Sequence, residues 1–397
     1  MRNRRPVSEW AKVQLGDVAK VINGRPFKPH QWSDRGLPII RIQNLNGSND
    51  FNYYNGSFDP KLLVTPGTLL FAWSGSKGSS FGPHFWRRPE NGLLNYHTWK
   101  LEPSSKVDQR YLYQSLKKLT KEIEGKAHGA AGLVHIQKGW MESWMLNLPT
   151  LAEQREIAAI LGTWDEALDK LDTLIAAKDR RKQALLQQLL TVAAQKVGHG
   201  HARHRLGVLV ERVTRKNAVG NDNVLTISAQ QGLINQREYF NRNVAGADLS
   251  GYYLLRRGEF AYNRSSSIGF PYGAIKRLDH YDSGIVSTLY LCFRIKDDAE
   301  VSSDYLTHYL DGGFLNPGLR SIAKEGARAH GLLNVTADEF FDLDVFIPPL
   351  VLQKKIAAIL GSAESELRLL RQQRAALDQQ KRGLMQILLT GQKRVRV

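Results

Sequence analysis

An internal repeat constrains the fold of this chain more than any other feature of its sequence. Residues 148–162 read Leu-Pro-Thr-Leu-Ala-Glu-Gln-Arg-Glu-Ile-Ala-Ala-Ile-Leu-Gly, and 199 residues later 347–361 read Ile-Pro-Pro-Leu-Val-Leu-Gln-Lys-Lys-Ile-Ala-Ala-Ile-Leu-Gly. The register continues without a gap to 189–191 and 388–390, both Leu-Leu-Thr. Self-similarity at a fixed offset sets the architecture of a protein. The chain is therefore a tandem duplication.

The segments before these blocks also correspond, more faintly. The offset is 191 at Gly67 and Gly258, and 199 at Gly132 and Gly331. We therefore expect the second copy to carry about eight additional residues between Gly258 and Gly331. Between the two copies, the N-terminal part differs and the C-terminal part is similar.

The similar C-terminal segments, from 148 and from 347 onward, predict two long helices that pack against each other. Their apolar residues step alternately by four and three, as the a and d positions of a heptad do. A helix from 153 to 191 would be about 55 to 60 Å long at about 1.5 Å per residue, which suits a spacer rod. Lys178, Lys182, Arg374 and Lys381 interrupt the pattern, so the alternative in which each helix only caps its own domain stays open. The predicted seam and partner-docking residues are Ile157, Leu161, Trp164, Leu168, Leu171, Ile356, Leu360, Leu367 and Leu370.

Domain boundaries follow from the repeat. We expect a mixed α/β fold with two pseudo-repeated globular domains, separated by two long helices packed as an antiparallel coiled coil. Strand-like runs such as 68–72 and 288–293 alternate with Gly and Asn turns, and 109–122 and 304–311 look helical. The expected divisions are a first variable domain at 1–147, a helix at 148–195, a linker at 196–203, a second variable domain at 204–346, and a helix with a basic tail at 347–397.

The charge of the chain points to a polyanionic partner. Its 55 Lys and Arg exceed its 38 Asp and Glu, for a formal net charge of +17. Nucleic acid is the first candidate, although a basic surface alone carries no sequence information. Cys292 is the single cysteine and lies in an apolar run, so we expect it in a core, in a reducing compartment. Without an apolar leader or a run of about 18 apolar residues, we expect a cytoplasmic protein that does not cross a membrane.

Polar and basic residues on Gly-rich or Ser-rich turns are the candidates for DNA contact. Such turns let side chains reach phosphates or base edges from a rigid scaffold. For each single residue an ordinary surface role remains the alternative. The candidates are Arg25, Lys28, Lys77, Arg87, Arg88, His97, Lys126 and His128 in the first variable domain, and Arg264, Ser265, Arg328 and His330 in the second.

Catalytic signatures are absent from the sequence. It contains no phosphate-binding Gly-x-x-x-x-Gly-Lys-Ser/Thr loop and no Asn/Asp-Pro-Pro-Tyr motif of an adenine methyltransferase. Glu124 and Lys126 form a Glu-x-Lys tripeptide found in nucleases, but no upstream acid on a clear strand accompanies it. His199, His201 and His204 could hold a metal, yet a solvated linker is the better interpretation. We therefore expect no catalytic, cofactor-binding or metal-binding residues.

Both repeated blocks have the form Pro-x-Leu-x-x-Gln-x-x-Ile and lead into a long helix behind a variable domain. In this the whole chain resembles the specificity (S) subunit of type I restriction-modification systems. The second block departs from the family pattern at Leu352, Lys354 and Lys355, where Glu and Arg-Glu are frequent.

The resemblance implies a non-catalytic subunit that binds double-stranded DNA. Each variable domain would be a target recognition domain for one half of a bipartite, asymmetric site, and the paired helices would set the spacing. Two modification (methyltransferase) subunits would dock on the helical spacer, and restriction (endonuclease/translocase) subunits would join through them. S-adenosylmethionine, ATP and Mg would belong to those partners. The alternatives are a stand-alone DNA nuclease or methyltransferase with two DNA-reading lobes, and a helical scaffold that does not bind DNA.

Overall fold

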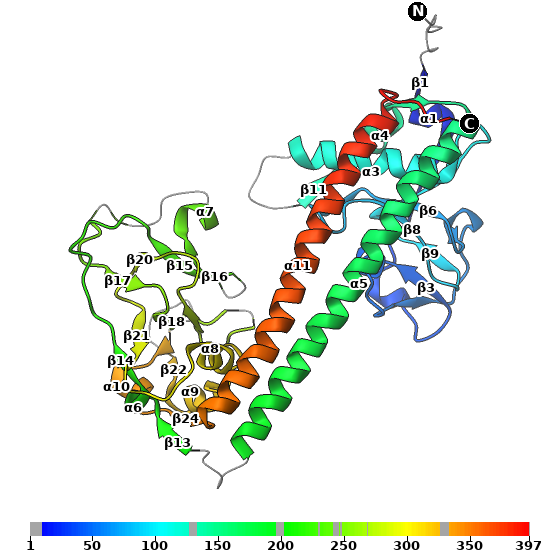
Figure 1. The fold of residues 1–397 in the computed structure, drawn as a ribbon. Coiled ribbons are helices and arrows are strands. Elements are labelled where there is room, and N and C mark those ends of the chain that lie inside the picture. Colours follow the sequence, from blue (N-terminus) through cyan, green and yellow to red (C-terminus); the bar gives the residue numbers. More distant parts are fainter. Residues whose placement is uncertain are drawn as a thin grey trace, which may run out of the picture. The chain divides into compact units, whose positions relative to one another are not determined.

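The computed structural model describes residues 10–126, 133–195, 202–228, 231–240, 246, 248–267, 269–325 and 333–396. It divides into two compact units, Met1–Thr173 with Gln372–Val397, and Leu174–Arg371. Each unit joins one globular domain to part of both long helices, α5 (Leu151–Gln195) and α11 (Leu350–Leu389) (Figure 1).

The first unit is built on a four-stranded antiparallel sheet. Its strand order is β2 (Ala19–Asn23), β10 (Thr98–Pro103), β6 (Leu69–Ala72) and β8 (Gly82–Phe85). Helix α3 (Gln109–Lys126) packs on β8. The remaining elements are β1 (Ala11–Gln14) paired with β12 (Met145–Leu148), β7 (Ser74–Ser76) paired with β11 (Leu133–His135), a smaller sheet of β4 (Tyr53–Tyr54), β3 (Leu37–Ile40), β9 (Gly92–Leu94) and β5 (Leu63–Val64), and the short helices α1 (Leu15–Val18), η1 (Pro29–Gln31), α2 (Ile42–Leu45), η2 (Pro60–Leu62) and α4 (Lys138–Glu142).

The second unit repeats this sheet with the same topology. Its strand order is β14 (Val210–Arg212), β21 (Leu291–Ile295), β18 (Phe260–Asn263) and β19 (Ala274–Arg277). The remaining elements are β13 (Ala202–Arg205) paired with β24 (Asp344–Ile347), β15 (Leu225–Ser228) with β16 (Gly232–Asn235), β17 (Tyr253–Arg256) with β20 (Ser283–Val286), β22 (Lys324–Glu325) with β23 (Leu333–Asn334), and the helices α6 (Leu206–Leu209), α7 (Gln236–Phe240), α8 (Ser303–Asp311), α9 (Asn316–Ile322) and α10 (Ala337–Phe341).

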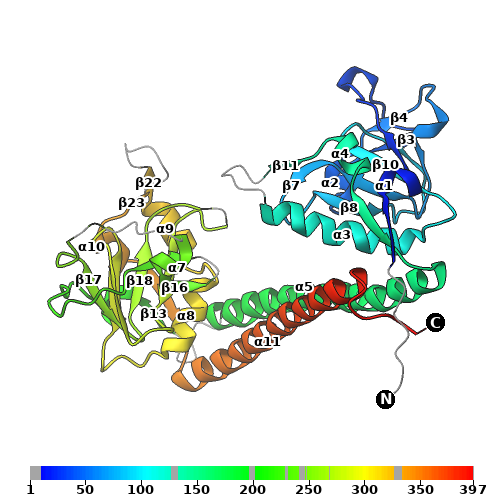
Figure 2. The ribbon, with the colours of Figure 1, turned by 90° about the horizontal axis from the view of Figure 1, so that it is seen from above.

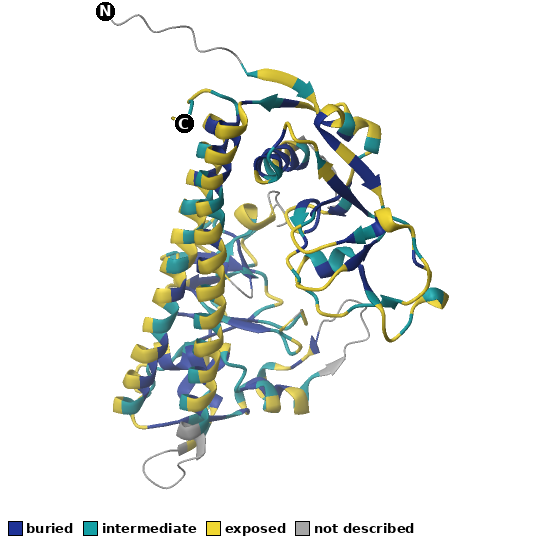
Figure 3. Ribbon diagram, turned by 90° about the vertical axis from the view of Figure 1, so that its right-hand side faces the viewer, coloured by how far each residue is buried: buried dark blue, intermediate teal, exposed yellow. Residues whose placement is uncertain are grey.

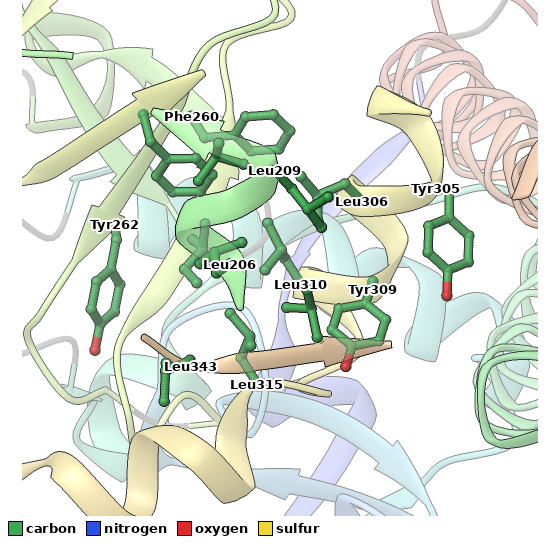
Figure 4. Close-up of a cluster of buried hydrophobic side chains, with 14 of the residues drawn as sticks. Leu206, Leu209, Phe260, Tyr262, Tyr305, Leu306, Tyr309, Leu310, Leu315 and Leu343 are labelled. Atoms are coloured by element: carbon green, nitrogen blue, oxygen red, sulfur yellow. The ribbon is translucent and has the colours of Figure 1, made fainter. Parts of the chain in front are cut away.

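The core of each globular domain contains the start of one long helix and the end of the other. Ile157 and Leu161 of α5 join the first core together with Met385 and Leu389 of α11. The second core contains the residues 199 positions away from these, namely Ile356, Leu360, Leu186 and Leu190. Figure 4 shows the sheet, α6 and α8 side chains of this second core, with Phe260, Leu206 and Tyr309 among them. Helix ends that contribute apolar side chains to a domain core are held firmly to that domain.

The two long helices run antiparallel within each unit (Figure 2). In the first unit, Lys381 Nζ lies 2.5 Å from an Asp165 carboxylate oxygen, and Arg374 Nε lies 3.0 Å from Asp172. The residue numbers of the paired side chains therefore rise along α5 while they fall along α11, as they do in an antiparallel pair. Most positions of the two helices are exposed or intermediate, and buried residues recur at separate positions along them (Figure 3). Seam residues Leu168, Leu171 and Leu367 are 7%, 9% and 2% exposed, which explains the heptad spacing.

The basic residues that interrupt the heptads find acidic partners on the facing helix. In the second unit, Lys182 Nζ lies 2.6 Å from Glu364 and Lys178 Nζ lies 2.5 Å from Glu366. The Lys182–Glu364 pair is the repeat counterpart of Lys381–Asp165, because both residues are shifted by 199 positions. Paired charges at a heptad seam fix the register of the helices.

The predicted mixed α/β fold with two repeated domains and an antiparallel helix pair is confirmed. The seam ends at Ile157 and Ile356 lie in domain cores, so each helix packs on its own domain as well as on the other helix, and neither is purely a spacer. In the second copy α8 ends at Asp311 and a separate helix, α9, follows it, whereas the first copy has one long helix, α3. Buried Cys292 lies in a core as expected, and burial raises the pKa of its thiol to about 12.

Candidate nucleic-acid interface

A polar pocket of about 390 Å³ lies on the first domain, where the chain leaves β3 and where it turns into β10. Trp32 and Tyr96 at this pocket are 37% and 44% exposed, which is unusual for large aromatic side chains. Exposed aromatic rings beside amide and guanidinium groups suit contact with bases. The lining residues are Phe27, Trp32, Ile39, Arg41, Ile42, Gln43, Asn95, Tyr96, His97 and Thr98.

His97 contributes a neutral imidazole to this pocket. Burial lowers the pKa of His97 below its ordinary value, so the ring carries one donor and one acceptor at neutral pH. Its ring centroid lies 3.7 Å from that of Tyr96. Within the described residues, the Thr98 hydroxyl and the Asn95 amide oxygen are buried without a hydrogen-bond partner. The pocket therefore keeps hydrogen-bonding capacity for a ligand.

Arg25 and Lys28 lie on the segment that forms one wall of the pocket. The Arg25 guanidinium sits 4.4 Å from the centroid of the Phe27 ring and 4.8 Å from that of Tyr54. Its Nε and Nη2 atoms have no hydrogen-bond partner in the described part of the chain. Lys28 is exposed at the start of η1. The structure thus brings Arg25, Lys28 and His97 to one region.

Arg88, Arg87 and Lys77 do not line this pocket and have different surroundings. Arg88 stacks on Phe51, 4.8 Å from the ring centroid, and bonds the Asn49 side chain, so it braces a loop. Arg87 Nη1 lies 3.2 Å from Asp169 of α5. Lys77 is exposed on the turn after β7.

The carboxylate of Glu124 has a structural role. It is 4% exposed and accepts a hydrogen bond from the backbone N–H of Gly78 at 2.6 Å. Lys121 Nζ lies 3.1 Å from its second oxygen. These contacts hold the turn that carries Lys77. They also give both oxygens of the Glu124 carboxylate a partner, although a Glu-x-Lys nuclease would need that carboxylate to bind a metal ion.

In the second domain, Arg264 is bound to backbone carbonyls. Its Nε and Nη2 atoms donate to the Leu289 oxygen, and its Nη1 atom donates to the Val335 oxygen at 2.8 Å. The neighbouring Ser265 N–H donates to the Asn263 side chain at 3.1 Å. Arg264 therefore positions the turn that carries Ser265.

Four candidates fall at gaps in the described residues. Lys126 is the last residue of α3, and its side chain is outside the described part. His128, Arg328 and His330 lie outside it altogether. In the described residues, no group of three His, Cys, Asp or Glu side chains is arranged to hold a metal ion. No helix in that part of the chain is both long and apolar enough to span a membrane.

Sequence reasoning missed Trp32, Arg41 and Gln43. Arg41 lies over the Trp32 ring, 5.6 Å from its centroid, and bonds the Asn52 side chain. Gln43 Nε2 donates to the Asp50 carbonyl at 3.2 Å. The available signal was the run Arg-Ile-Gln directly after the apolar strand at 37–40, where polar side chains cluster at a strand end.

The predicted seam residues are mostly buried inside the chain. Ile157, Leu161, Leu168, Leu171, Ile356, Leu360 and Leu367 are buried, and Trp164 and Leu370 are half-buried. Their apolar surface already packs within the chain. Exposed apolar residues lie on other faces of the helices, namely Leu174, Ile359 and Leu369, which are 42%, 46% and 57% exposed.

Comparison with known proteins agrees with this architecture. Residues 7–178 match the family model described as "Type I restriction modification DNA specificity domain". The chain is 30% identical over 181 residues to the type I restriction enzyme EcoBI specificity subunit of Escherichia coli. The resemblance to type I specificity subunits is confirmed. The matched residues cover the first globular domain and α5 as far as residue 178.

The coverage of these relatives differs. The match spans 45% of this chain and 35% of the EcoBI subunit. Over 196 residues, the chain is 27% identical to the MjaVIII specificity subunit of Methanocaldococcus jannaschii and spans 44% of it. The putative MjaX specificity subunit of the same organism matches across 98% of this chain and 94% of its own length, at 22% identity.

Solved structures share the fold of the whole chain. A crystal structure of the type I restriction-modification S subunit from M. genitalium has a TM-score of 0.56 and 14% identity, with 98% of each chain covered. A chain from a study of complex assembly and conformational transition of the type I system has a TM-score of 0.52 and 13% identity, covering 98% of this chain and all of that one. These two likenesses concern the fold.

Proposed function

We propose that this chain is the DNA specificity subunit of a type I restriction-modification complex. Each globular domain reads one half of a bipartite, asymmetric site, and the paired helices fix the distance between the halves. The observation that carries the proposal is the repeated core: both domains bury the start of one antiparallel helix and the end of the other. Two readers built on one framework can differ in their loops while their spacing stays constant.

For the first domain, we propose that the pocket lined by Trp32, Arg41 and His97 contacts bases. Arg25 and Lys28 at its edge would bind the neighbouring phosphates. The net charge of +17 supports contact with a polyanion. In the second domain, the turn of Ser265 that Arg264 positions is the corresponding candidate. Lys77, Arg87, Arg88, Lys126, His128, Arg328 and His330 remain candidates for phosphate contact.

We further propose that modification subunits dock on the helical spacer and that restriction subunits join through them. The exposed apolar residues Leu174, Ile359 and Leu369 of the helices support a docking role. S-adenosylmethionine, ATP and Mg would then be bound by those partners, which perform methyl transfer and cleavage. The engagement of Glu124 by Gly78 argues against the stand-alone nuclease alternative.

The experiment that tests the proposal is adenine-methylation mapping by long-read sequencing. Cells would carry the chain with its modification subunit, either unchanged or with residues 204–346 exchanged for another recognition domain. We expect a split methylated motif in which only one half changes on exchange. A motif that ignores the exchange, or no motif at all, would contradict two independent readers on a fixed spacer and would favour the scaffold alternative.

A further inference from the structure

A second pocket of the first unit, about 730 Å³ in volume, is lined by three arginines. Arg87 follows β8, Arg110 lies in the first turn of α3, and Arg155 is the fifth residue of α5. Phe85, Ala158 and Ala159 give the pocket an apolar wall. It shares no residue with the pocket that we assign to base contact.

The arginines of this pocket are largely without partners. Arg110 and Arg155 are exposed, and no side-chain hydrogen bond or ion pair of either is present in the described residues. Arg87 pairs with Asp169, and both side chains are more than half exposed. Asp108 at the pocket is used as a helix cap, since its carboxylate accepts from the Arg110 and Tyr111 N–H groups. Two guanidinium groups are therefore available to an incoming ligand.

In the second copy, the positions equivalent to this arginine pocket are occupied by side chains that bind one another. The strand pairings make Phe85 equivalent to Arg277, and the matching bonds of Gln154 and Gln353 make Asp108 equivalent to Ser302. By the same alignments Arg87 corresponds to Asp279, and Arg110 corresponds to Asp304.

The Arg277 guanidinium is paired with two carboxylates at this position. It lies 2.7 Å from Asp279 and 2.8 Å from Asp304, and it also donates to the Ser303 hydroxyl at 2.8 Å. Its side chain is only 17% exposed. The second copy thus supplies both the cation, Arg277, and its two carboxylates, Asp279 and Asp304. The first copy has Arg87 and Arg110 at the positions of the carboxylates, and the apolar ring of Phe85 at the position of the cation.

We infer that the arginine pocket of the first unit binds carboxylate side chains of a partner protein. The charges at the two equivalent positions are reversed between the copies, so the group missing from the first copy is a carboxylate. Guanidinium forks bind carboxylates through two parallel hydrogen bonds. A concave pocket with an apolar wall suits the hydrocarbon stem of Glu or Asp better than the sugar-flanked phosphates of a duplex. The site is present in one copy only, so it distinguishes the two ends of an otherwise repeated chain.

The test uses the full chain and a fluorescein-labelled hexaglutamate peptide, with hexaglutamine as the control peptide. Binding would be followed by fluorescence anisotropy for the unchanged chain and for the Arg110→Glu/Arg155→Glu variant. The matched control is Lys354→Glu/Lys355→Glu, which makes the same change in net charge at two exposed positions near the start of α11. Lys354 is the equivalent of Arg155. Arg110→Gln/Arg155→Gln is a second, milder variant that introduces no new charge.

We expect hexaglutamate to bind at least about tenfold more weakly to the arginine variant and less than about twofold more weakly to the lysine control. Equal loss in both variants would show attraction by net charge and would overturn the site. The same proteins would be titrated with a duplex of about 20 base pairs. If only duplex binding fell in the arginine variant, the pocket would be a phosphate site and the inference would be wrong. None of these outcomes depends on the methylation experiment, so the two proposals can fail separately.

Discussion

The side-chain oxygen of Gln154 accepts a hydrogen bond of 2.7 Å from the backbone N–H of Asp108. Gln154 is fully buried, and its Nε2 atom donates to the carbonyls of Lys106 and Pro149. This glutamine therefore ties the first turn of α5 to the start of α3. It is the Gln of the repeated Pro-x-Leu-x-x-Gln block, and Gln353 makes the same three bonds to Ser302, Glu300 and Pro348.

Replacing Gln154 by Leu should lower the free energy of unfolding by about 2 to 4 kcal/mol, because three backbone groups, one of them in a fully buried bond, lose their partners. Gln353→Leu should have a similar effect. Urea denaturation followed by circular dichroism measures the change. Gln187→Leu is the control, since Gln187 is an exposed glutamine of the same helix. A Gln154→Leu variant as stable as this control would rule out the proposed role.

Asp165 is the only carboxylate in contact with both Lys117 and Lys381 among the described residues. Its oxygens lie 2.6 Å from Lys117 Nζ and 2.5 Å from Lys381 Nζ. Burial, together with the nearby Lys117 charge, lowers the pKa of Lys381 to about 8. Removing the carboxylate leaves two ammonium groups in a largely buried place. Asp165→Asn should therefore destabilise the chain by about 3 kcal/mol.

Lys381→Met should change the stability by less than about 1 kcal/mol, because Asp165 keeps Lys117 and Gln114 as partners while an apolar side chain replaces a buried cation. Thermal and urea unfolding of the two variants under one buffer condition would compare them directly. If Lys381→Met were the more damaging change, the lysine rather than the carboxylate would be the essential partner.

His308 should make the stability of the second unit depend on pH. Burial lowers the pKa of His308 from its ordinary value of 6.5, an effect that Glu364 partly opposes and Lys182 reinforces. A histidine with a lowered folded-state pKa contributes stability above its unfolded-state pKa, and that contribution is lost as the pH falls below it. The stability should therefore decrease as the pH falls from about 7.5 to about 5.5.

His308→Gln should remove this part of the pH dependence. Gln114 stands at the equivalent position of the first unit, where it bonds Asp165 at 2.6 Å, so glutamine suits this environment. Urea unfolding of both proteins at the two pH values gives the difference. Identical pH profiles for the two proteins would mean that His308 does not contribute.

Lys28 and Lys77 should contribute to the salt dependence of DNA binding. Each lysine that contacts a phosphate changes the slope of log K against log salt by about 0.9. Lys28→Ala and Lys77→Ala should each reduce the slope by about 1 without a change in sequence preference. Anisotropy titrations between about 50 and 200 mM salt measure the slope. Lys170→Ala, on an exposed position of α5, should leave it unchanged.

Much of the fold could be predicted from the sequence because the repeat preserves local patterns. The heptad spacing around Leu168 and Leu367 determined two long helices, and the constant offset from 148 onward determined that the two copies share one framework. Even the basic residues at 182 and 381 were visible as interruptions. Periodicity and register are properties of neighbouring residues, so they can be read along the chain.

Only the tertiary structure decided which residues meet. It joined Trp32, Arg41 and His97 from separate segments into one pocket, and it placed Asp165 between Lys117 and Lys381. It also showed that Arg277 is neutralised by its own domain while Arg110 and Arg155 are not. Such sites depend on contacts between segments far apart in the sequence. Their loops vary in length and composition without changing the local patterns that specify helices and strands, so those patterns do not predict the sites. The sequence alone therefore determined the repeated framework, and the packing of distant segments decided the surroundings of each functional side chain.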